Sequence, residues 1–266
     1  MFGFGEIAER LRRSTVQVFP EQPNRKERGS GSGVIWRPDG AVLTNSHVAR
    51  SNTAEVELWD GRRFSARVIS RDSRRDLALL SIESASLESA TRGDSGAVRA
   101  GEFVLAIGNP LGFAGAISRG VVHSIGRIDG MGTNAWIRAG VQLAPGNSGG
   151  PLINARGEVI GINTAILNGL GLAIPSNTAS EFVNRGPRPS LGVTLQTERN
   201  GLRIIQVEPN GPAAQASLKE GDLLLGTFDD LSDALDTARD VLALKFLRTN
   251  RLRETHVRFG VRAEAA

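Results

Sequence analysis

The stretch Pro145-Gly-Asn-Ser-Gly-Gly-Pro151 decides the fold, because it sets a serine, Ser148, among glycines and directly ahead of an apolar run. Glycine accepts backbone angles that are closed to other residues and keeps side chains out of the path of an approaching molecule. The turn therefore suits an exposed nucleophile, with the backbone amides of Gly146, Asn147 and Ser148 available as oxyanion-hole donors. An ordinary surface turn carries the same Pro-Gly and Asn-Ser signals, so this stretch alone leaves both interpretations open.

A base and a carboxylate lie upstream of this turn. His47 ends one apolar run and Asp76 directly precedes another. The order His, Asp, Ser is one of those in which a Ser-His-Asp triad recurs. In such a triad Ser148 attacks a carbonyl carbon, His47 takes and returns the proton, and Asp76 orients the imidazole. Two other acids, Asp60 and Asp72, lack the apolar strand start that follows Asp76.

Short motifs around these residues run through nearly all of the first 185 residues. They are Gly29-Ser-Gly-Ser-Gly33, Leu43 to Val48, Asp76 to Leu80, Gly108-Asn-Pro-Leu-Gly112, Gly146 to Pro151, Gly161-Ile-Asn-Thr-Ala-Ile166 and Ala173-Ile-Pro-Ser-Asn177. In this order they resemble the motifs of the HtrA (high-temperature-requirement, Deg) family of trypsin-like serine proteases. The resemblance implies a mainly β, chymotrypsin-like fold, a double six-stranded β-barrel with the triad in the cleft between the barrels.

The spacing of the apolar runs indicates the same fold class. Residues 1–184 hold evenly spaced strand-like runs separated by turn residues such as Asp60-Gly61, a pattern typical of an all-β barrel or sandwich. Short helices are expected at Glu6 to Arg13 and Ser176 to Asn184. The run Gly29 to Gly33 superficially resembles a dinucleotide-binding loop. Because it leads into a strand rather than a helix, phosphate binding is not expected.

A second domain is expected after a linker at residues 185–190, which holds two prolines and a glycine. Residues 191–266 resemble a small, shortened α/β PDZ domain of the HtrA type, on the strength of Gly201 to Pro209 and Gly211 to Asp222. Apolar residues at helical spacing from Leu231 to Leu242 predict a helix within it. A hairpin is expected to follow, with its turn at Thr249-Asn250.

The resemblance implies a peptide-binding role for this domain. A PDZ domain adds an extended chain end to the edge of its sheet. The backbone amides of Leu191, Gly192 and Val193 would receive the carboxylate of the peptide C-terminus. Two departures weaken this expectation: Ser190 stands where an aromatic residue is frequent, and the segment after Leu225 is shorter than usual.

The resemblance also places Gln142, Leu143 and Leu170 at the primary specificity pocket. The two leucines favour small to medium aliphatic side chains before the scissile bond, and the neutral Gln142 argues against a preference for Lys or Arg. Gly140 stands where the family usually has Asp, and Ala144 where it usually has Asn. The missing acidic group would loosen the loops that form the oxyanion hole, so low or conditional activity is one expected outcome.

Composition limits the other classes of function. The net charge of +4 is modest, and short arginine clusters such as Arg12-Arg13 lack interleaved aromatic residues, so no nucleic-acid partner is expected. The chain has no cysteine, which excludes disulfides and thiolate sites. His123 and His256 lie in strand-like runs without a cluster of carboxylates or cysteines beside them, so neither a metal nor another cofactor is expected.

The cellular compartment stays open at this stage. Met1 to Arg13 holds no apolar signal-peptide core and no run predicts a transmembrane segment, so the sequence alone favours the cytoplasm. Family resemblance instead implies the cell envelope, the periplasm.

Two functions of different classes follow. The first is an ATP-independent serine endopeptidase of protein quality control, which cleaves unfolded or misfolded polypeptides through an acyl-enzyme and is assisted by a PDZ domain. The alternative is a catalytically weak or inactive, chaperone-like peptide-binding protein of the same fold. The resemblance further implies a homotrimer, through Phe2, Phe4 and the first strand.

Overall fold

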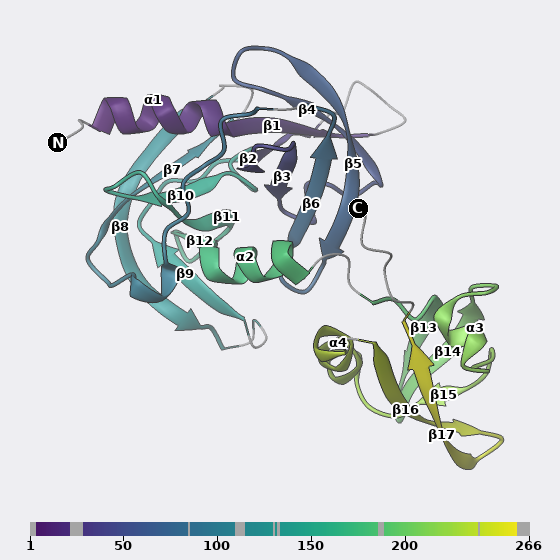
Figure 1. Cartoon of the computed structure of the whole chain (residues 1–266). Helices are drawn as coiled ribbons and strands as arrows, with labels where there is room; N and C mark the ends of the chain where they lie inside the picture. The colour runs from purple at the N-terminus through teal and green to yellow at the C-terminus, as the bar shows by residue number, and fades with distance from the viewer. Residues whose placement is uncertain are drawn as a thin grey trace. The chain divides into compact units, whose positions relative to one another are not determined.

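The computed structural model of the chain contains two compact units, Met1–Pro187 and Arg188–Ala266, and each is described by itself (Figure 1). The division falls inside the stretch expected as a linker. The residues that the structure describes are 4–21, 29–84, 86–109, 115–129, 131, 134–185, 189–238 and 240–259.

The first unit begins with a closed six-stranded barrel of antiparallel strands in the order β1-β2-β3-β6-β5-β4. Its interior is filled by small and branched apolar side chains such as Val18, Val42, Val56 and Leu80, all fully buried. Its strands are β1 (Thr15–Pro20), β2 (Gly31–Arg37), β3 (Ala41–Thr44), β4 (Thr53–Glu57), β5 (Arg63–Asp72) and β6 (Leu77–Ile82).

A second closed six-stranded barrel follows, in the order β10-β11-β12-β9-β8-β7. Its strands are β7 (Phe103–Gly108), β8 (Ala116–Arg127), β9 (Ala135–Ala139), β10 (Pro151–Asn154), β11 (Val159–Leu167) and β12 (Leu170–Pro175). The two barrels confirm the predicted mainly β, chymotrypsin-like fold. The candidate nucleophile turn immediately precedes β10, and Asp76 immediately precedes β6.

The first unit has one helix at each end of its sequence. A short 3-10 turn, η2 (Ser95–Ala97), lies between the two barrels in the sequence. Helix α1 (Phe4–Ser14) buries Ile7 and Leu11, and helix α2 (Ser176–Arg185) buries Phe182 and Val183. These side chains belong to one apolar cluster that also includes residues of both barrels. The helices therefore help to hold the two barrels together.

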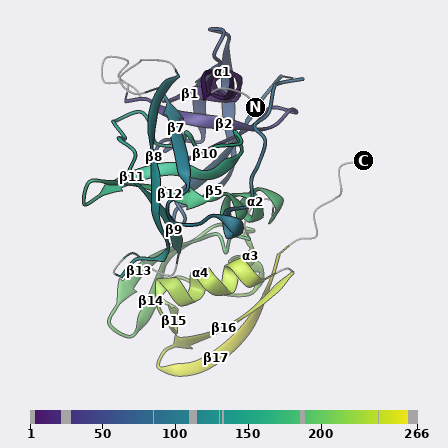
Figure 2. The same cartoon turned by 90° about the vertical axis from the view of Figure 1, so that its left-hand side faces the viewer.

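The second unit is a five-stranded sheet in the sequential order β13 to β17. Figure 2 shows helix α4 lying along one face of this sheet, where Leu231, Ala234 and Leu235 pack against its core. The elements are β13 (Val193–Glu198), β14 (Gly201–Val207), α3 (Pro212–Gln215), β15 (Leu223–Leu224), α4 (Phe228–Thr237), β16 (Val241–Arg248) and β17 (Arg251–Arg258).

The helix predicted up to Leu242 is wrong at its C-terminal end. A capping box between Thr227 and Asp230 starts α4, and the chain turns extended at Ala238. Val241 and Leu242 lie in strand β16, where exposed and buried side chains alternate. The apolar residues of this segment fit both a helical spacing and the alternating pattern of a strand. The strand forms because β16 pairs with β17 along its whole length.

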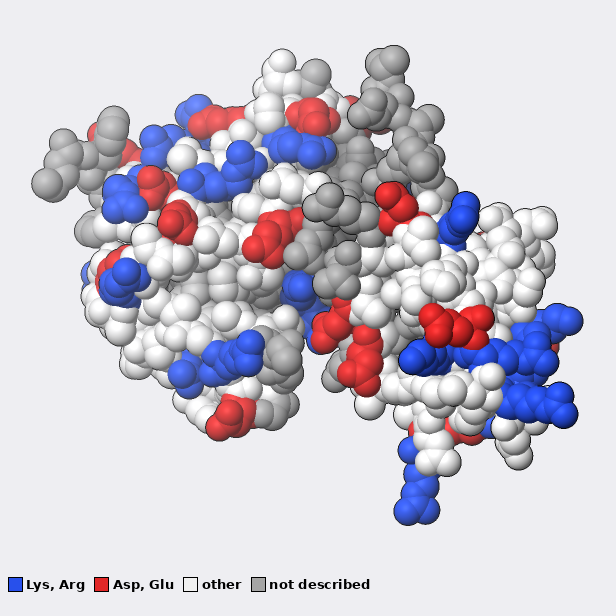
Figure 3. Space-filling model, turned by 60° about the horizontal axis from the view of Figure 1, so that its bottom comes forward, with Lys and Arg blue, Asp and Glu red and all other residues white. Residues whose placement is uncertain are grey.

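None of the helices in the described ranges is long and apolar enough to cross a membrane. Figure 3 shows charged side chains of both signs on one face, mixed at the left of the view and mainly Lys and Arg at its lower right. Some charged residues pair with a neighbour in the sequence, as Arg12 does with Glu9 and Arg62 with Asp60.

Candidate active site

His47 and Asp76, the two candidate residues of the first barrel, are in direct contact. The distance from His47 Nδ1 to Asp76 Oδ2 is 2.7 Å, and the backbone N–H of His47 donates to Asp76 Oδ1 at 2.9 Å. The backbone contact anchors the carboxylate beside His47, and the contact at Nδ1 orients the imidazole. Because Nδ1 is engaged, the opposite ring nitrogen, Nε2, is the one left for chemistry. The His47 side chain is 44% exposed, which leaves it accessible to a substrate.

Asp76 adopts an unusual backbone conformation, with a φ of 54° in the left-handed region. This region is costly for a residue other than glycine, so neighbouring contacts must hold it there. Asn45 Nδ2 donates to the carbonyl of Asp76 at 2.8 Å, and the preceding turn is tied by the amides of Arg74 and Arg75 to Asp72 Oδ1. Since strained residues gather at functional sites, this conformation is consistent with a catalytic role.

The two rival acids serve other purposes. Asp72 is buried and forms an ion pair with Arg75 at 2.7 Å, so it organises the turn that leads to Asp76. Asp60 lies at a hairpin turn, where burial raises the pKa of its carboxyl. Hydrogen bonds from the backbone and guanidinium of Arg62 outweigh that effect and hold the pKa below its usual range.

Thr164 is a site residue to which sequence reasoning assigned no role. From β11, its hydroxyl donates to Asp76 Oδ2 at 2.5 Å, and its backbone carbonyl accepts the hydroxyl of Ser148 at 2.9 Å. One residue of the second barrel thus contacts both the carboxylate and the candidate nucleophile. A threonine in a strand has no distinguishing signal, so only its place in the motif Gly161 to Ile166 could have pointed to it.

The nucleophile turn is tightly constrained. Gly146 has a φ of 105° and Gly149 a φ of 88°, both in the region that favours glycine. A Cβ atom at Gly149 would lie 2.0 Å from the carbonyl oxygen of Ser32, so no other residue fits there. The Ser148 hydroxyl donates to Thr164, and no described hydrogen bond joins it to the His47 ring. A rotation of the Ser148 side chain would be needed to direct it towards His47.

Two of the three expected oxyanion-hole amides are free in this conformation. The amide of Asn147 donates to the carbonyl of Ala144 at 3.0 Å, so it is not available to a substrate. The expectation for Asn147 is corrected accordingly. The amides of Gly146 and Ser148 make no hydrogen bond to another described residue, and they are the remaining candidates.

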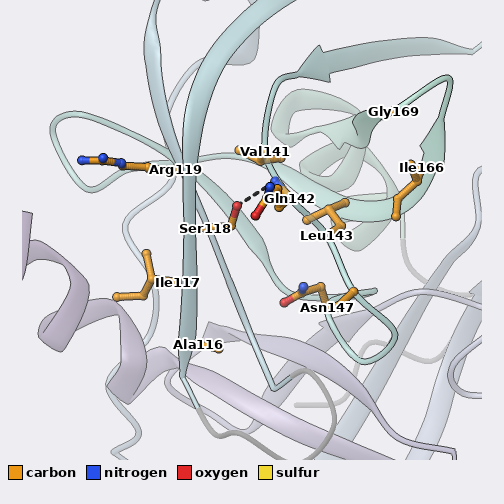
Figure 4. A pocket seen from close by; sticks show the side chains of 11 residues that line it. Ala116, Ile117, Ser118, Arg119, Val141, Gln142, Leu143, Asn147, Ile166 and Gly169 are labelled. Atoms are coloured by element: carbon orange, nitrogen blue, oxygen red, sulfur yellow. Dashed lines mark hydrogen bonds between the residues drawn. The ribbon is translucent and has the colours of Figure 1, made fainter.

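A pocket of about 790 Å³ adjoins the turn (Figure 4). Gln142 and Leu143, expected at the primary specificity pocket, are among its lining residues, whereas Ile166 lines it and Leu170 does not. Leu170 pairs with Leu167 across the β11–β12 turn, so it shares the face of Leu167 and not that of its neighbour Ile166. The lining residues are Ala116, Ile117, Ser118, Arg119, Val141, Gln142, Leu143, Ala144, Asn147, Ile166 and Gly169.

The two departures from the family pattern do not prevent the turn from forming. Next to Gly140 lies the ring of His123, whose Nε2 would be 2.9 Å from an added Cβ atom. An Asp at this position would therefore displace His123. Ala144 supplies only its backbone carbonyl, to the Asn147 amide, and that contact does not depend on the side chain.

The expected carboxylate loop of the second unit precedes β13, which is the outermost strand of its sheet. Leu191 is buried, and its carbonyl accepts the amide of Ala213 at 2.9 Å. The amide of Gly192 lies 3.2 Å from the hydroxyl of Ser190. Val193 begins the strand and pairs with Val207, so the other edge of β13 is open among the described residues.

The fold and these contacts are similar to those of trypsin-like serine peptidases. A model of the family "Trypsin-like peptidase domain" matches residues 31–162. This range holds the candidate triad and most of both barrels.

Individual relatives point to one branch of this class. The periplasmic serine endoprotease DegP of Escherichia coli is 38% identical over 226 residues, which cover 73% of this chain and 47% of DegP. The HtrA-type protease AlgW, solved with a tripeptide, is 29% identical, covers 98% of both chains and has a TM-score of 0.66. The serine endoprotease of Yersinia pestis is 27% identical, covers 97% of both chains and has a TM-score of 0.64.

These similarities support a trypsin-like serine protease of the HtrA/DegP type. The chain spans about half the length of curated relatives such as DegP.

Proposed function

We propose that this chain is an ATP-independent serine endopeptidase that cleaves unfolded or misfolded polypeptides through an acyl-enzyme. The observation that carries the proposal is the convergence of both barrels on Thr164. Its hydroxyl contacts the carboxylate that orients His47, and its carbonyl holds the hydroxyl of Ser148. An ordinary surface turn is not expected to share a hydrogen-bond partner, here Thr164, with a His-Asp pair.

In the proposed mechanism Ser148 Oγ attacks the scissile carbonyl while His47 Nε2 accepts its proton. Asp76 holds the ring with Nδ1 as donor and stabilises the imidazolium that forms. The developing oxyanion is stabilised by the amides of Gly146 and Ser148. His47 then protonates the leaving amine as the peptide bond breaks. A water molecule next attacks the acyl carbon while His47 takes its proton, and His47 returns that proton to Ser148 Oγ as the ester bond breaks and the acid product leaves.

The pocket supports a preference for aliphatic residues before the scissile bond. Leu143, Val141 and Ile166 supply apolar lining, and no acidic residue is among the lining side chains to pair with Lys or Arg. Gln142 is neutral, which agrees with this preference.

For the second unit we propose a PDZ role, in which a peptide C-terminus adds to the open edge of β13 and its carboxylate meets the amides of Leu191 to Val193, replacing the Ser190 hydroxyl as the acceptor of the Gly192 amide. The relative AlgW, solved with a tripeptide, makes a short peptide a reasonable ligand class. A homotrimer assembled through the N-terminal segment is part of the same proposal. Phe2 lies outside the described residues.

The test is the cleavage of fluorescently labelled casein by the purified chain and by Ser148→Ala. We expect the substitution to lower the rate by at least about 10⁴-fold and to leave the thermal unfolding temperature nearly unchanged. Activity that persists in Ser148→Ala, or that requires ATP, would contradict the proposal.

The alternative, a chaperone-like peptide binder, is favoured by one observation, the direction of the Ser148 hydroxyl towards Thr164. This alternative predicts that the wild-type chain and Ser148→Ala suppress the aggregation of an unfolded protein equally well, and that neither cleaves it.

A further inference from the structure

Ser32, in β2 of the first barrel, lies directly against the nucleophile turn of the second barrel. Its side chain is fully buried. Its backbone N–H donates to the carbonyl of Ser148 at 2.8 Å, and its hydroxyl donates to the carbonyl of Gly146 at 2.6 Å. It belongs to the run Gly29 to Gly33, which the proposed mechanism does not use.

The direction of the Ser32 hydroxyl follows from its other partner. The amide of Asn109 donates to Ser32 Oγ at 2.9 Å. A hydroxyl carries one hydrogen, so with Asn109 bound at a lone pair that hydrogen is directed to Gly146. The backbone carbonyl of Ser32 accepts the hydroxyl of Thr44 at 2.6 Å. The contacts with Asn109 and Thr44 lie outside the turn, so they hold Ser32 in position independently of it.

Gly146 and Ser148 are also the two residues whose amides remain free as oxyanion-hole donors. Each of them has its carbonyl held by Ser32, one through a side-chain bond and the other through a backbone bond. A glycine at a φ of 105° is the residue least restrained by its own sterics. The orientation of Gly146 therefore depends on outside contacts, and the Ser32 hydroxyl is a side-chain contact of this kind.

We infer that Ser32 is a positioning residue that sets the oxyanion hole from the opposite barrel, an inference that rests on the proposed function. Without the Ser32 hydroxyl, the buried carbonyl of Gly146 loses its hydrogen-bond donor, and the turn can rearrange until another donor reaches this carbonyl. The Gly146 carbonyl and amide lie in neighbouring peptide planes that are joined at a flexible glycine Cα, so a shift of that carbonyl would move the Gly146 amide out of the direction of the developing oxyanion. Because that interaction strengthens in the transition state, the loss should appear in kcat and not in KM.

The test compares Ser32→Ala with a matched control, Ser176→Ala. Ser176 is also fully buried and donates to a backbone carbonyl, that of Gly93, at 2.7 Å, but it lies on α2 away from the turn. The measurements are kcat and KM for a fluorogenic peptide, the thermal unfolding temperature, and the inhibition constant of a peptide aldehyde. The aldehyde carbon bonds reversibly to a serine Oγ, and its oxygen takes the place of the oxyanion.

For Ser32→Ala we expect kcat to fall about 100-fold, as it does when one oxyanion donor is lost, with KM within about twofold of wild type. The inhibition constant of the aldehyde should rise in proportion. Ser176→Ala should lower the unfolding temperature similarly while kcat stays near the wild-type value.

The inference is overturned if kcat of Ser32→Ala stays within about threefold of wild type, or if the aldehyde affinity does not follow kcat. If Ser32→Ala does not fold under conditions in which Ser176→Ala folds, Ser32→Cys, whose thiol is a weak donor, takes its place and is judged by the same criteria. If the wild-type chain neither cleaves the peptide nor binds the aldehyde, the proposed function itself fails.

Discussion

Replacement of Thr164 by valine probes the contact that joins the two barrels at the site. Valine has nearly the same shape but no hydroxyl, so the change removes the 2.5 Å hydrogen bond to Asp76 Oδ2 and keeps the backbone carbonyl that accepts the Ser148 hydroxyl. A hydrogen bond to a charged group contributes about 1.5–3 kcal/mol. Since about 1.4 kcal/mol corresponds to a factor of ten in rate, full loss of this bond predicts a fall in kcat of about 10- to 100-fold.

The fall should stay within that range because Asp76 keeps both of its contacts with His47. Initial rates on a fluorogenic peptide at several concentrations separate kcat from KM. Thr255→Val is a suitable control, since its hydroxyl donates to the carbonyl of Ala216 at 2.9 Å in the second unit. An unchanged kcat in Thr164→Val, or an equal effect in the control, would refute the role assigned to this hydroxyl.

Three other predictions concern the pocket, the second unit and its ligand. Ile166→Ala should lower kcat/KM by about 10-fold for a peptide with an aliphatic residue before the scissile bond, whereas Leu170→Ala should leave kcat/KM unchanged. A loss in Leu170→Ala and none in Ile166→Ala would place the pocket on the strand face of Leu170. Burial raises the pKa of the Asp222 carboxyl, but hydrogen bonds from Arg248 and from the backbone amide of Lys219 outweigh it and hold the pKa below the usual value. A lowered folded-state pKa stabilises the unit above the unfolded value of about 3.9, and this stabilisation is lost as pH falls through the folded-state pKa. Thermal unfolding of the full chain between pH 6 and pH 2 should therefore show a decline that is smaller in Arg248→Leu, and an equal decline in both would contradict this. Calorimetry should detect binding of a free-acid peptide at about micromolar affinity and none of its C-terminally amidated form, while equal binding of both would remove the carboxylate-receptor role.

The sequence predicted the first unit well because its signals are local. Alternating apolar runs and turn residues define the strands of both barrels, and the structure brings His47 and Asp76 into contact at the strand ends where the sequence placed them. A histidine after a strand and an acid before one are visible without knowledge of any distant contact.

What the sequence missed depends on contacts between distant segments. Thr164 and Ser32 have no unusual residue type or spacing, and their importance comes from partners 88 and 114 positions away. The choice between Ile166 and Leu170 as pocket residues depends on the strand register across the β11–β12 turn. Val241 fits a helical face and an alternating strand equally well, and pairing with Arg258 decides for the strand.

The central claim is that Ser148 is an activated nucleophile. A fluorophosphonate reacts with an activated serine and leaves a covalent phosphonyl group on it, so incubation of the purified chain followed by mass spectrometry of its peptides tests the claim directly. The account predicts one added phosphonyl group on the peptide that contains Ser148, and its absence from Ser148→Ala and His47→Ala. Absence of the adduct from the folded wild-type chain, or its presence on another residue, would contradict it.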